Sequence, residues 1–258
     1  VRCVEETGLD GSNRAGALFS TFMRWGTLVG AYMHNSNKFY VKKQVTRHLS
    51  QKITLQNRYI NPLFDFAYYD NNEQKTSINT SEIILQTHYG KNEVFIQNGP
   101  IRKSLGGQKG PAIDVKYTLG VNGVLGSAFN YHKLDLMLTQ KIGLGSIGRT
   151  QYWLNTGKVF STLPYPLLNV HLGNESLFYT NTAFSLMNYF EFVSDQYISF
   201  VHEHHFDGFI FNRIPLMRKL KWRTVTNVNI LYGSVSKENV EIIPNNVTKF
   251  TTFDSQPY

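Results

Sequence analysis

The pattern that comes nearest to a chemical site is the run His202-Glu203-His204-His205. Imidazole nitrogens are common zinc ligands, and on a strand His202 and His204 would share one face while Glu203 and His205 share the other. A zinc site would need a further ligand from another element. The His-Glu-x-x-His spacing of zinc proteases is absent, because Phe206 stands four residues after His202. We therefore expect structural or lumen-facing polar residues and no metal, with a metal site at His202, His204 and His205 as the alternative.

The glycine-rich segment Gly143–Gly148 has the Gly-x-Gly-x-x-Gly spacing of dinucleotide-binding loops. That spacing binds a pyrophosphate when a strand precedes it and a helix follows, because the helix N-terminus supplies N–H donors. Here the following residues, Arg149–Leu154, are patterned as a strand. The segment is therefore predicted to be a hairpin turn, and no cofactor is expected.

Three carboxylates, Glu191, Asp195 and Asp207, lie near one another in the sequence. Paired carboxylates perform acid–base chemistry when their environments differ. Ion pairs with Arg and Lys inside a β-protein are the simpler interpretation, and the Gly-x-Ser-x-Gly motif of serine hydrolases is absent. The sequence therefore predicts that the chain is not an enzyme.

The composition limits the protein classes that could position these side chains. Cys3 is the only cysteine, which excludes a disulfide within the chain and a cysteine metal cluster. The net charge is +8, but the basic residues are spread along the chain. The densest basic run, Arg218–Arg223, is interpreted as a solvated turn or barrel rim, and no nucleic-acid partner is expected.

No stretch approaches the roughly 18–20 consecutive apolar residues of a membrane helix, and the mean hydropathy is −0.28. Neither observation excludes a membrane β-barrel, because only alternate residues of each strand face lipid. The aromatic content of 14% fits the aromatic girdles of such barrels but also occurs in soluble β-sandwiches.

Alternation of apolar and polar residues with a period of two dominates the chain, which is typical of half-buried strands. It is clearest in Lys52–Tyr59, Ile113–Leu119 and Leu134–Thr139. Further segments of this kind are Ala17–Trp25, Phe39–Leu49, Glu82–Tyr89, Arg149–Phe160, Gln196–Phe206 and Trp222–Tyr232. Several run to about ten residues, longer than the roughly 5–6 of soluble strands and close to the 9–11 that cross a membrane. Polar turns are expected at Asp70–Lys75 and Gly106–Pro111.

These strands predict an all-β fold, an antiparallel transmembrane β-barrel of which the chain supplies about ten or eleven strands. The expected lipid face includes Ile113, Val115, Tyr117, Leu134, Leu136 and Leu138. Leu163–Phe192 departs from the alternation, because Pro164 and Pro166 preclude a central strand. This long segment is expected to be a functional loop or a barrel plug, with Ala183–Phe192 as a short helix or the start of the next strand.

Two long motifs, Pro164–Glu175 and Phe184–Asp195, resemble a family of Bacteroidota outer-membrane proteins of unknown function, and the resemblance continues through Glu203–Phe206 and Asn212–Arg223. Members of that family carry a carboxypeptidase-regulatory-like domain ahead of a barrel that is distantly similar to the bacterial surface-antigen barrels. The Arg-Gly-Phe/Tyr loop signature of assembly insertases is absent from this chain. The resemblance implies structural, lumen or loop roles for Gly173, Asn174, Glu175, Asn188, Glu191, Asp195, Glu203, His204, His205, Arg213 and Arg218.

The resulting hypothesis treats residues 1–258 as one partial outer-membrane β-barrel domain, whose N-terminal domain and C-terminal closing strands lie outside the chain. It predicts a non-catalytic transport or protein-assembly role in the bacterial outer membrane, with outer-membrane lipid and other envelope or secretion proteins as partners. The alternative is a soluble β-sandwich that binds carbohydrate or protein, in which the apolar faces of successive strands meet in one dry core. A metal-dependent enzyme at His202, His204 and His205 is a third option.

Overall fold

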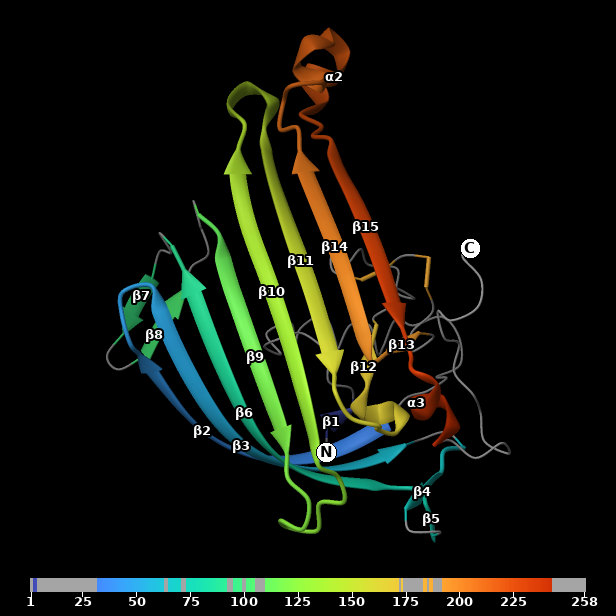
Figure 1. Ribbon diagram of the computed structural model, residues 1–258. Coiled ribbons are helices and arrows are strands. Elements are labelled where there is room, and N and C mark those ends of the chain that lie inside the picture. Colours follow the sequence, from blue (N-terminus) through green and yellow to red (C-terminus); the bar gives the residue numbers. More distant parts are fainter. Residues whose placement is uncertain are drawn as a thin grey trace.

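The fold is dominated by one large antiparallel β-sheet (Figure 1). In this computed structural model, the described residues are 2–3, 32–62, 65–70, 73–91, 95–98, 101–104, 110–171, 173, 183–184, 186–187 and 192–242. The sheet has nine strands among these residues, in the order β1 (Arg2–Cys3), β2 (Tyr32–Gln44), β3 (Leu49–Pro62), β6 (Ile78–Gly90), β9 (Ala112–Gly120), β10 (Tyr131–Gly143), β11 (Arg149–Val159), β14 (Gln196–His205) and β15 (Val225–Ser234).

The remaining elements are short and lie in the connections between these strands. Three two-stranded sheets pair β4 (Tyr68–Asp70) with β5 (Glu73–Lys75), β7 (Phe95–Asn98) with β8 (Ile101–Ser104), and β12 (Asn169–Val170) with β13 (Val193–Ser194). The helices among the described residues are η1 (Gly145–Ile147), η2 (Tyr165–Leu167), η3 (Phe211–Arg213), α2 (Pro215–Leu220) and α3 (Lys237–Glu241). Among the described residues, no helix is long and apolar enough to cross a membrane.

The predicted all-β antiparallel architecture is confirmed, and most predicted strands are present with ends shifted by a few residues. Strand β3 has 14 residues and β10 has 13, well above the roughly 5–6 of typical soluble strands. Within the described residues, β1 and β15 stand at the two ends of the sheet and do not pair with each other. The predicted segment Ala17–Trp25 lies outside the described residues.

Two predictions about connections are wrong. Phe39–Leu49 is not one strand, because β2 ends at Gln44 and the backbone N–H groups of Val45 and Thr46 both donate to Leu49 O in a tight turn. The predicted loop Asp70–Lys75 contains strand β5, because Glu73–Lys75 pair with Tyr68–Asp70 of β4.

The glycine-rich segment Gly143–Gly148 is the predicted hairpin turn, with η1 between β10 and β11. The turn closes where Leu144 N donates to Gly148 O at 2.8 Å. Gly145 and Gly148 have φ of +60° and +110°, a region that side-chain-bearing residues rarely adopt. The glycines therefore serve the turn geometry.

The strand register gives the sheet one apolar and one polar face, because directly opposed residues of paired strands point to the same side. In one row Ile53 opposes Leu85, Leu85 opposes Tyr117, and Tyr117 opposes Leu134. This row confirms that the six predicted apolar residues of β9 and β10 share a face, since Val115 opposes Leu136 and Ile113 opposes Leu138 in the neighbouring rows. The exposed members of this apolar face include Phe39, Val41, Ile53, Leu55, Ile83, Leu85, Ile113, Tyr117, Leu134, Leu136, Ile198, Val228, Ile230 and Tyr232.

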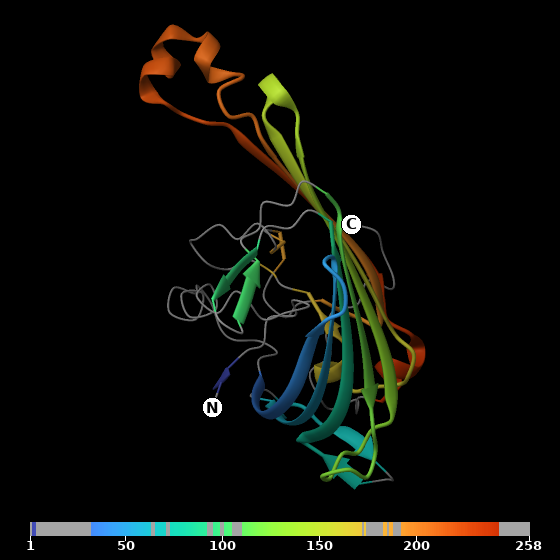
Figure 2. The same cartoon turned by 90° about the vertical axis from the view of Figure 1, so that its left-hand side faces the viewer.

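The sheet is curved, and η2, β12 and β13 lie on its concave side (Figures 1 and 2). A hydrophobic core fills this side at the lower end of the strands, where residues 163–170 are buried without interruption. They pack there against Ile60, Phe66, Tyr68, Ile78, Tyr131, Val159, Val193 and Val235. The first part of Leu163–Phe192, residues 163–170, thus packs against the sheet, whereas half of Ala183–Phe192 lies outside the described residues.

Candidate functional site

The concave side of the sheet carries the polar face, and this face is the candidate functional site. Its charged residues, assigned by the strand register, are Lys38, Lys42, Lys52, Arg58, Glu82, Asp114, Lys116, Lys133, Asp135, Lys141, Arg149 and Glu203. Two of the acids, Glu82 and Asp135, are buried. Buried carboxylates are costly unless they are paired or hydrogen-bonded, so their surroundings determine what the face can do.

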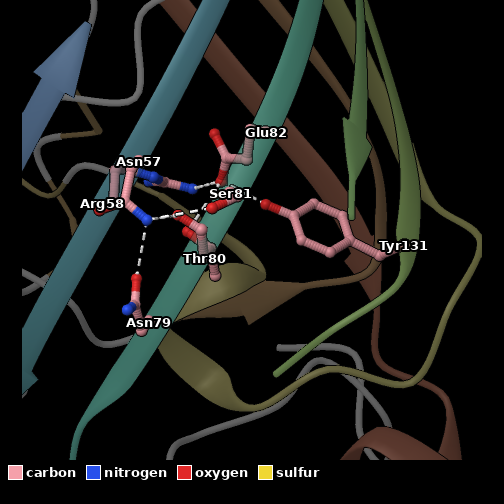
Figure 3. A network of polar contacts seen from close by, with 7 residues as sticks. All are labelled: Asn57, Arg58, Asn79, Thr80, Ser81, Glu82 and Tyr131. Atoms are coloured by element: carbon pink, nitrogen blue, oxygen red, sulfur yellow. Dashed lines mark hydrogen bonds and ion pairs between the residues drawn. The ribbon is translucent and has the colours of Figure 1, made fainter. Parts of the chain in front are cut away.

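Glu82 is the centre of a buried polar network (Figure 3). Its Oε1 atom accepts a hydrogen bond from the Tyr131 hydroxyl and forms an ion pair with the Arg58 guanidinium. Thr80 Oγ1 donates to the same oxygen at 3.3 Å. The carboxylate therefore joins side chains from three strands, β3, β6 and β10, and fixes their polar groups in one place.

A glycine makes this network possible. Gly120 of β9 lies in the same row as Glu82 of β6 and Tyr131 of β10, between the two. A Cβ atom at Gly120 would collide with the Tyr131 ring. The absence of a side chain lets the ring cross β9 and bring its hydroxyl to the carboxylate two strands away.

The same arrangement recurs two strands further along the sheet. Asp135 of β10, Gly157 of β11 and Tyr197 of β14 form one row. A Cβ atom at Gly157 would lie 2.6 Å from Tyr197 Cε1 and 2.7 Å from Asp135 Oδ1. The Tyr197 ring of β14 thus covers Gly157 of β11 and lies beside Asp135 of β10, as the Tyr131 ring covers Gly120 beside Glu82. Such aromatic–glycine contacts fix the register of curved sheets.

His171 follows β12 and rests on this second row. Its ring makes an edge contact with the Tyr197 ring at 4.8 Å between centroids, and its Nε2 atom is 2.6 Å from Ser194 Oγ. Burial, with a smaller contribution from the positive charge of Lys133, lowers the pKa of His171 from 6.5 to about 4. The imidazole is therefore neutral at pH 7.

The four residues of the histidine run alternate between the two faces because all of them belong to β14. His202 and His204 point to the apolar side, while Glu203 and His205 point to the polar side, where His205 Nε2 contacts Glu203 Oε1. Within the described part of the chain, no three His, Cys, Asp or Glu side chains converge as metal ligands would. The strand geometry therefore leaves His202 and His204 on one side of the sheet and places His205 on the other.

His202 and His204 form part of an aromatic column along β14. The rings of Phe200 and His202 stack at 6.3 Å, those of His202 and His204 at 6.5 Å, and His204 meets the edge of Phe206 at 4.3 Å. His202 Nε2 lies 2.7 Å from Thr150 Oγ1 of the neighbouring strand. The apolar face of β14 therefore ends, at the upper end of the sheet, in the amphipathic rings of His202 and His204.

Asp195 has a structural role, because it binds the start of α3. Its Oδ2 atom accepts hydrogen bonds from Ser236 N at 2.7 Å and from Asn239 Nδ2 at 2.9 Å, at the start of α3. Asn239 Oδ1 in turn accepts a bond from Leu163 N at 2.7 Å. Asp195 thus fixes α3 to the beginning of the buried segment 163–170, beside a hollow of about 550 Å³ that it lines together with Lys158. Of the other two carboxylates grouped with Asp195, Asp207 pairs with Arg149, and Glu191 lies outside the described residues.

The other predicted site residues lie apart from one another. Gly173 is buried and forms an isolated bridge with Phe184, and Arg213 and Arg218 are exposed in the β14–β15 connection. Asn174, Glu175, Asn188 and Glu191 lie outside the described residues.

Sequence reasoning missed the two rows of acid, glycine and tyrosine. Each acid occupies a polar position of an alternating strand, and Gly120 and Gly157 stand inside or at the end of such a strand. A glycine within a strand is a known sign of a close approach by another group. Its partner depends on strand register, which the sequence did not provide.

Comparison with known proteins identifies the family of this domain. Residues 29–243 match the description "Family of unknown function (DUF5686) C-terminal domain". The matched range includes every strand of the large sheet from β2 to β15. A search of curated proteins gives no match.

Proposed function

The chain belongs to this family of unknown function, of which it contains the C-terminal domain, and we propose that it forms the wall of a non-catalytic β-barrel in the bacterial outer membrane. In this proposal the barrel transports or assembles envelope components. Outer-membrane lipid surrounds it, and other envelope or secretion proteins are its partners. The distant resemblance to surface-antigen barrels agrees with such a role.

One observation carries the proposal: the sheet is apolar on its convex side and polar on its concave side. Ile53 and Val228, near opposite ends of the sheet, are 52% and 50% exposed. Soluble proteins rarely leave a continuous apolar area of this extent in water. Membrane barrels require it, because the lipid-facing residues alternate with residues that face a polar interior.

The apolar face also has the borders of a membrane band. On β10 its three leucines lie between His132 and Gln140, and on β14 the apolar residues lie between Gln196 and the histidines. His132 and Gln140 are about 26 Å apart along the strand at about 3.3 Å per residue. A tilt of roughly 40° reduces this to about 20 Å, near the roughly 25 Å apolar band of outer-membrane barrels.

The polar interior favours a closed or gated passage over an open pore. Residues 163–170 and the hydrophobic core occupy the concave side at the lower end of the strands. Cargo that crossed there would have to displace this segment or pass beside it. A role in protein assembly, where the wall itself interacts with a client, is equally compatible with this arrangement.

The β-sandwich alternative requires a second layer over the apolar face. In the part of the chain that the structure describes, the packed core lies on the opposite, concave side. The contacts therefore favour the barrel over the sandwich.

Heat-modifiable electrophoresis of the full-length protein from outer-membrane fractions tests the proposal. A closed barrel stays folded in SDS without boiling, so we expect faster migration before boiling than after it. Recovery of the protein in the soluble fraction without detergent, as a monomer with one cooperative thermal transition, would establish the sandwich instead.

A depletion experiment in cells separates transport from assembly. Loss of an assembly factor should reduce the amounts of several unrelated outer-membrane proteins. Loss of a transporter should change uptake or export of a solute while those amounts stay constant. Unchanged envelope composition and permeability would contradict both roles.

A further inference from the structure

The connection between β14 and β15, residues 207–224, has an unusual surface. It contains η3 and α2 and projects beyond the upper end of the sheet (Figure 1). We call it the basic loop. It carries five basic residues, Arg213, Arg218, Lys219, Lys221 and Arg223, against one acidic residue, Asp207.

The positive charge of the basic loop is not neutralised within the described protein. Asp207 faces Arg149 of β11, with 3.9 Å between its Oδ1 and Arg149 Nη2. None of the five basic side chains of the loop forms an ion pair with a described carboxylate. Arg213 instead lies over the Phe209 ring, 4.2 Å from its centroid. The loop therefore presents a concentrated positive charge outward.

Large apolar side chains stand among these cations. Leu216 and Trp222 are 68% and 55% exposed, and Ile210, Ile214 and Leu220 are exposed as well. Exposed cations alone would be a solvated surface. Their mixture with leucine, isoleucine and tryptophan is the composition of segments that lie in a membrane interface.

The basic loop is nevertheless held in one conformation. Phe206 N donates to Thr224 O at 3.0 Å where the loop leaves the sheet. The rings of Phe211 and Trp222 meet edge to face at 6.4 Å, which joins the two halves of the loop. The apolar and basic side chains therefore form a preorganised surface.

The position of the loop identifies what covers it. The apolar face ends on β14 at His202 and His204 and on β15 at Thr226, and the basic loop begins directly above these residues. If the apolar face lies in lipid, as proposed above, the loop stands at the level of the lipid head groups. Anionic head groups there are complementary to its charge.

We propose that the basic loop docks on the membrane surface, where its cations bind the phosphates of anionic lipids and its exposed apolar side chains enter the interface. This inference rests on the proposed barrel. Docking of the loop would anchor β14 and β15, the last strands of the described sheet, to the bilayer beside them.

The experiment uses the full-length protein, purified in zwitterionic detergent micelles with or without phosphatidylglycerol. Within residues 1–258, Trp222 is the only tryptophan left after Trp25→Phe and Trp153→Phe, and any tryptophan elsewhere in the full-length protein is replaced by phenylalanine as well. We expect its emission to shift to the blue with phosphatidylglycerol but not with phosphatidylcholine, and native mass spectrometry to detect selective retention of the anionic lipid. Each cation near an anionic surface strengthens association about fivefold, so Arg218→Glu/Lys219→Glu/Lys221→Glu should reduce retention at least tenfold.

A charge-preserving variant, Arg218→Lys/Lys219→Arg/Lys221→Arg, is the matched control and should retain the lipid. Equal emission and retention in both lipids, or no loss in the reversed variant, would overturn the inference. A third result would also overturn the inference: the lipid changes neither emission nor retention, and the charge-reversed variant loses a protein that co-purifies with the wild type. The loop would then bind that protein. Heat-modifiable migration of the same samples distinguishes this failure from failure of the barrel itself.

Discussion

At the scale of single residues, the polar face depends on two glycines. Gly120 and Gly157 leave the space that Tyr131 and Tyr197 occupy as they cross a neighbouring strand. Each ring ends beside a buried acid, Glu82 or Asp135. The glycines therefore contribute because they have no Cβ atom, which leaves room for the rings. The tyrosines connect strands that do not pair with each other.

The first prediction concerns Gly120→Ala. The added methyl group collides with the Tyr131 ring, which must leave Glu82, so we expect a loss of about 1–3 kcal/mol from overpacking. Urea unfolding in detergent micelles, followed by tryptophan fluorescence, measures it. Gly143→Ala is the matched control, because nothing lies within 4 Å of its added Cβ. Equal stability of the two variants would refute the role of the crossing.

The second prediction concerns the ion pair between Arg58 and Glu82. Glu82→Gln leaves a largely buried guanidinium without its anion, which should reduce the free energy of unfolding by about 3 kcal/mol. Asp207→Asn is the control, because Arg149 and Asp207 have side chains 67% and 52% exposed, and loss of this surface pair should cost under about 1 kcal/mol. Chemical unfolding of both variants under identical conditions tests the difference.

At the scale of elements, the connection between β11 and β14 is held at two points. Asp195 and Asn239 join its beginning to α3, and His171 packs on Tyr197 of β14. Both contacts bring residues far apart in sequence onto the lower end of the sheet. They attach the described parts of this connection to α3 and to β14.

The third prediction removes the first of these contacts. Asp195→Ala removes the acceptor of Ser236 N and one of the two acceptors of Asn239 Nδ2, so α3 should detach at a cost of about 1–3 kcal/mol. Limited proteolysis should then cut near residues 236–242 sooner than in the wild type. Glu238→Ala, an exposed residue of the same helix, should leave the cleavage rate unchanged. Matching cleavage rates for both variants would exclude Asp195 as the anchor.

The fourth prediction is a pH dependence of stability. The folded protein holds the pKa of His171 at about 4, below its ordinary 6.5, because the site disfavours the imidazolium. The unfolded chain therefore binds the proton first as pH falls. Stability is complete above about pH 6.5 and decreases toward pH 4, by on the order of 3 kcal/mol. Urea midpoints measured across this range should fall more steeply in the wild type than in His171→Gln. Parallel curves would contradict the assignment.

At the scale of the whole molecule, the sheet separates an apolar convex side from a charged concave side. Between their polar borders, the apolar positions of β2 to β15 include no Asp, Glu, Lys or Arg among the described residues. The other charged residues of the same strands lie on the concave side, except Lys43 and Lys158, which stand at the borders of the apolar face. This distribution is the reverse of a soluble domain, whose charged side chains face outward.

The fifth prediction follows from that reversal. Leu136→Arg places a charge in the middle of the apolar face of β10, which should disfavour folding into phospholipid vesicles by about 2–4 kcal/mol. Thr139→Arg puts the same side chain on the polar face of the same strand and should have a much smaller effect. Reversible folding titrations in vesicles compare them. Similar penalties for the two variants would mean that lipid does not contact the apolar face.

The prediction from sequence was best where a signal is local. Alternation identified β3, β9, β10, β11 and β14 and the shared face of Ile113 with Leu138, because the side-chain direction in a strand has a fixed period. It failed at Val45–His48, where a tight turn interrupts an otherwise alternating run. The histidine run was assigned to the correct alternation, but its aromatic column with Phe200 was not foreseen, since stacking depends on the neighbours along the actual strand.

The sequence by itself determined that the protein is all-β, that its strands are long, and that each has one apolar and one polar side. Those properties follow from residue order, since every strand carries its own alternation. Only the tertiary structure decided which acid meets which base, and that Gly120 and Gly157 make room for tyrosines. Such contacts are set by the register between strands and by the curvature of the sheet, and Glu82 and Arg58, although 24 residues apart in the chain, become neighbours only when β3 and β6 pair.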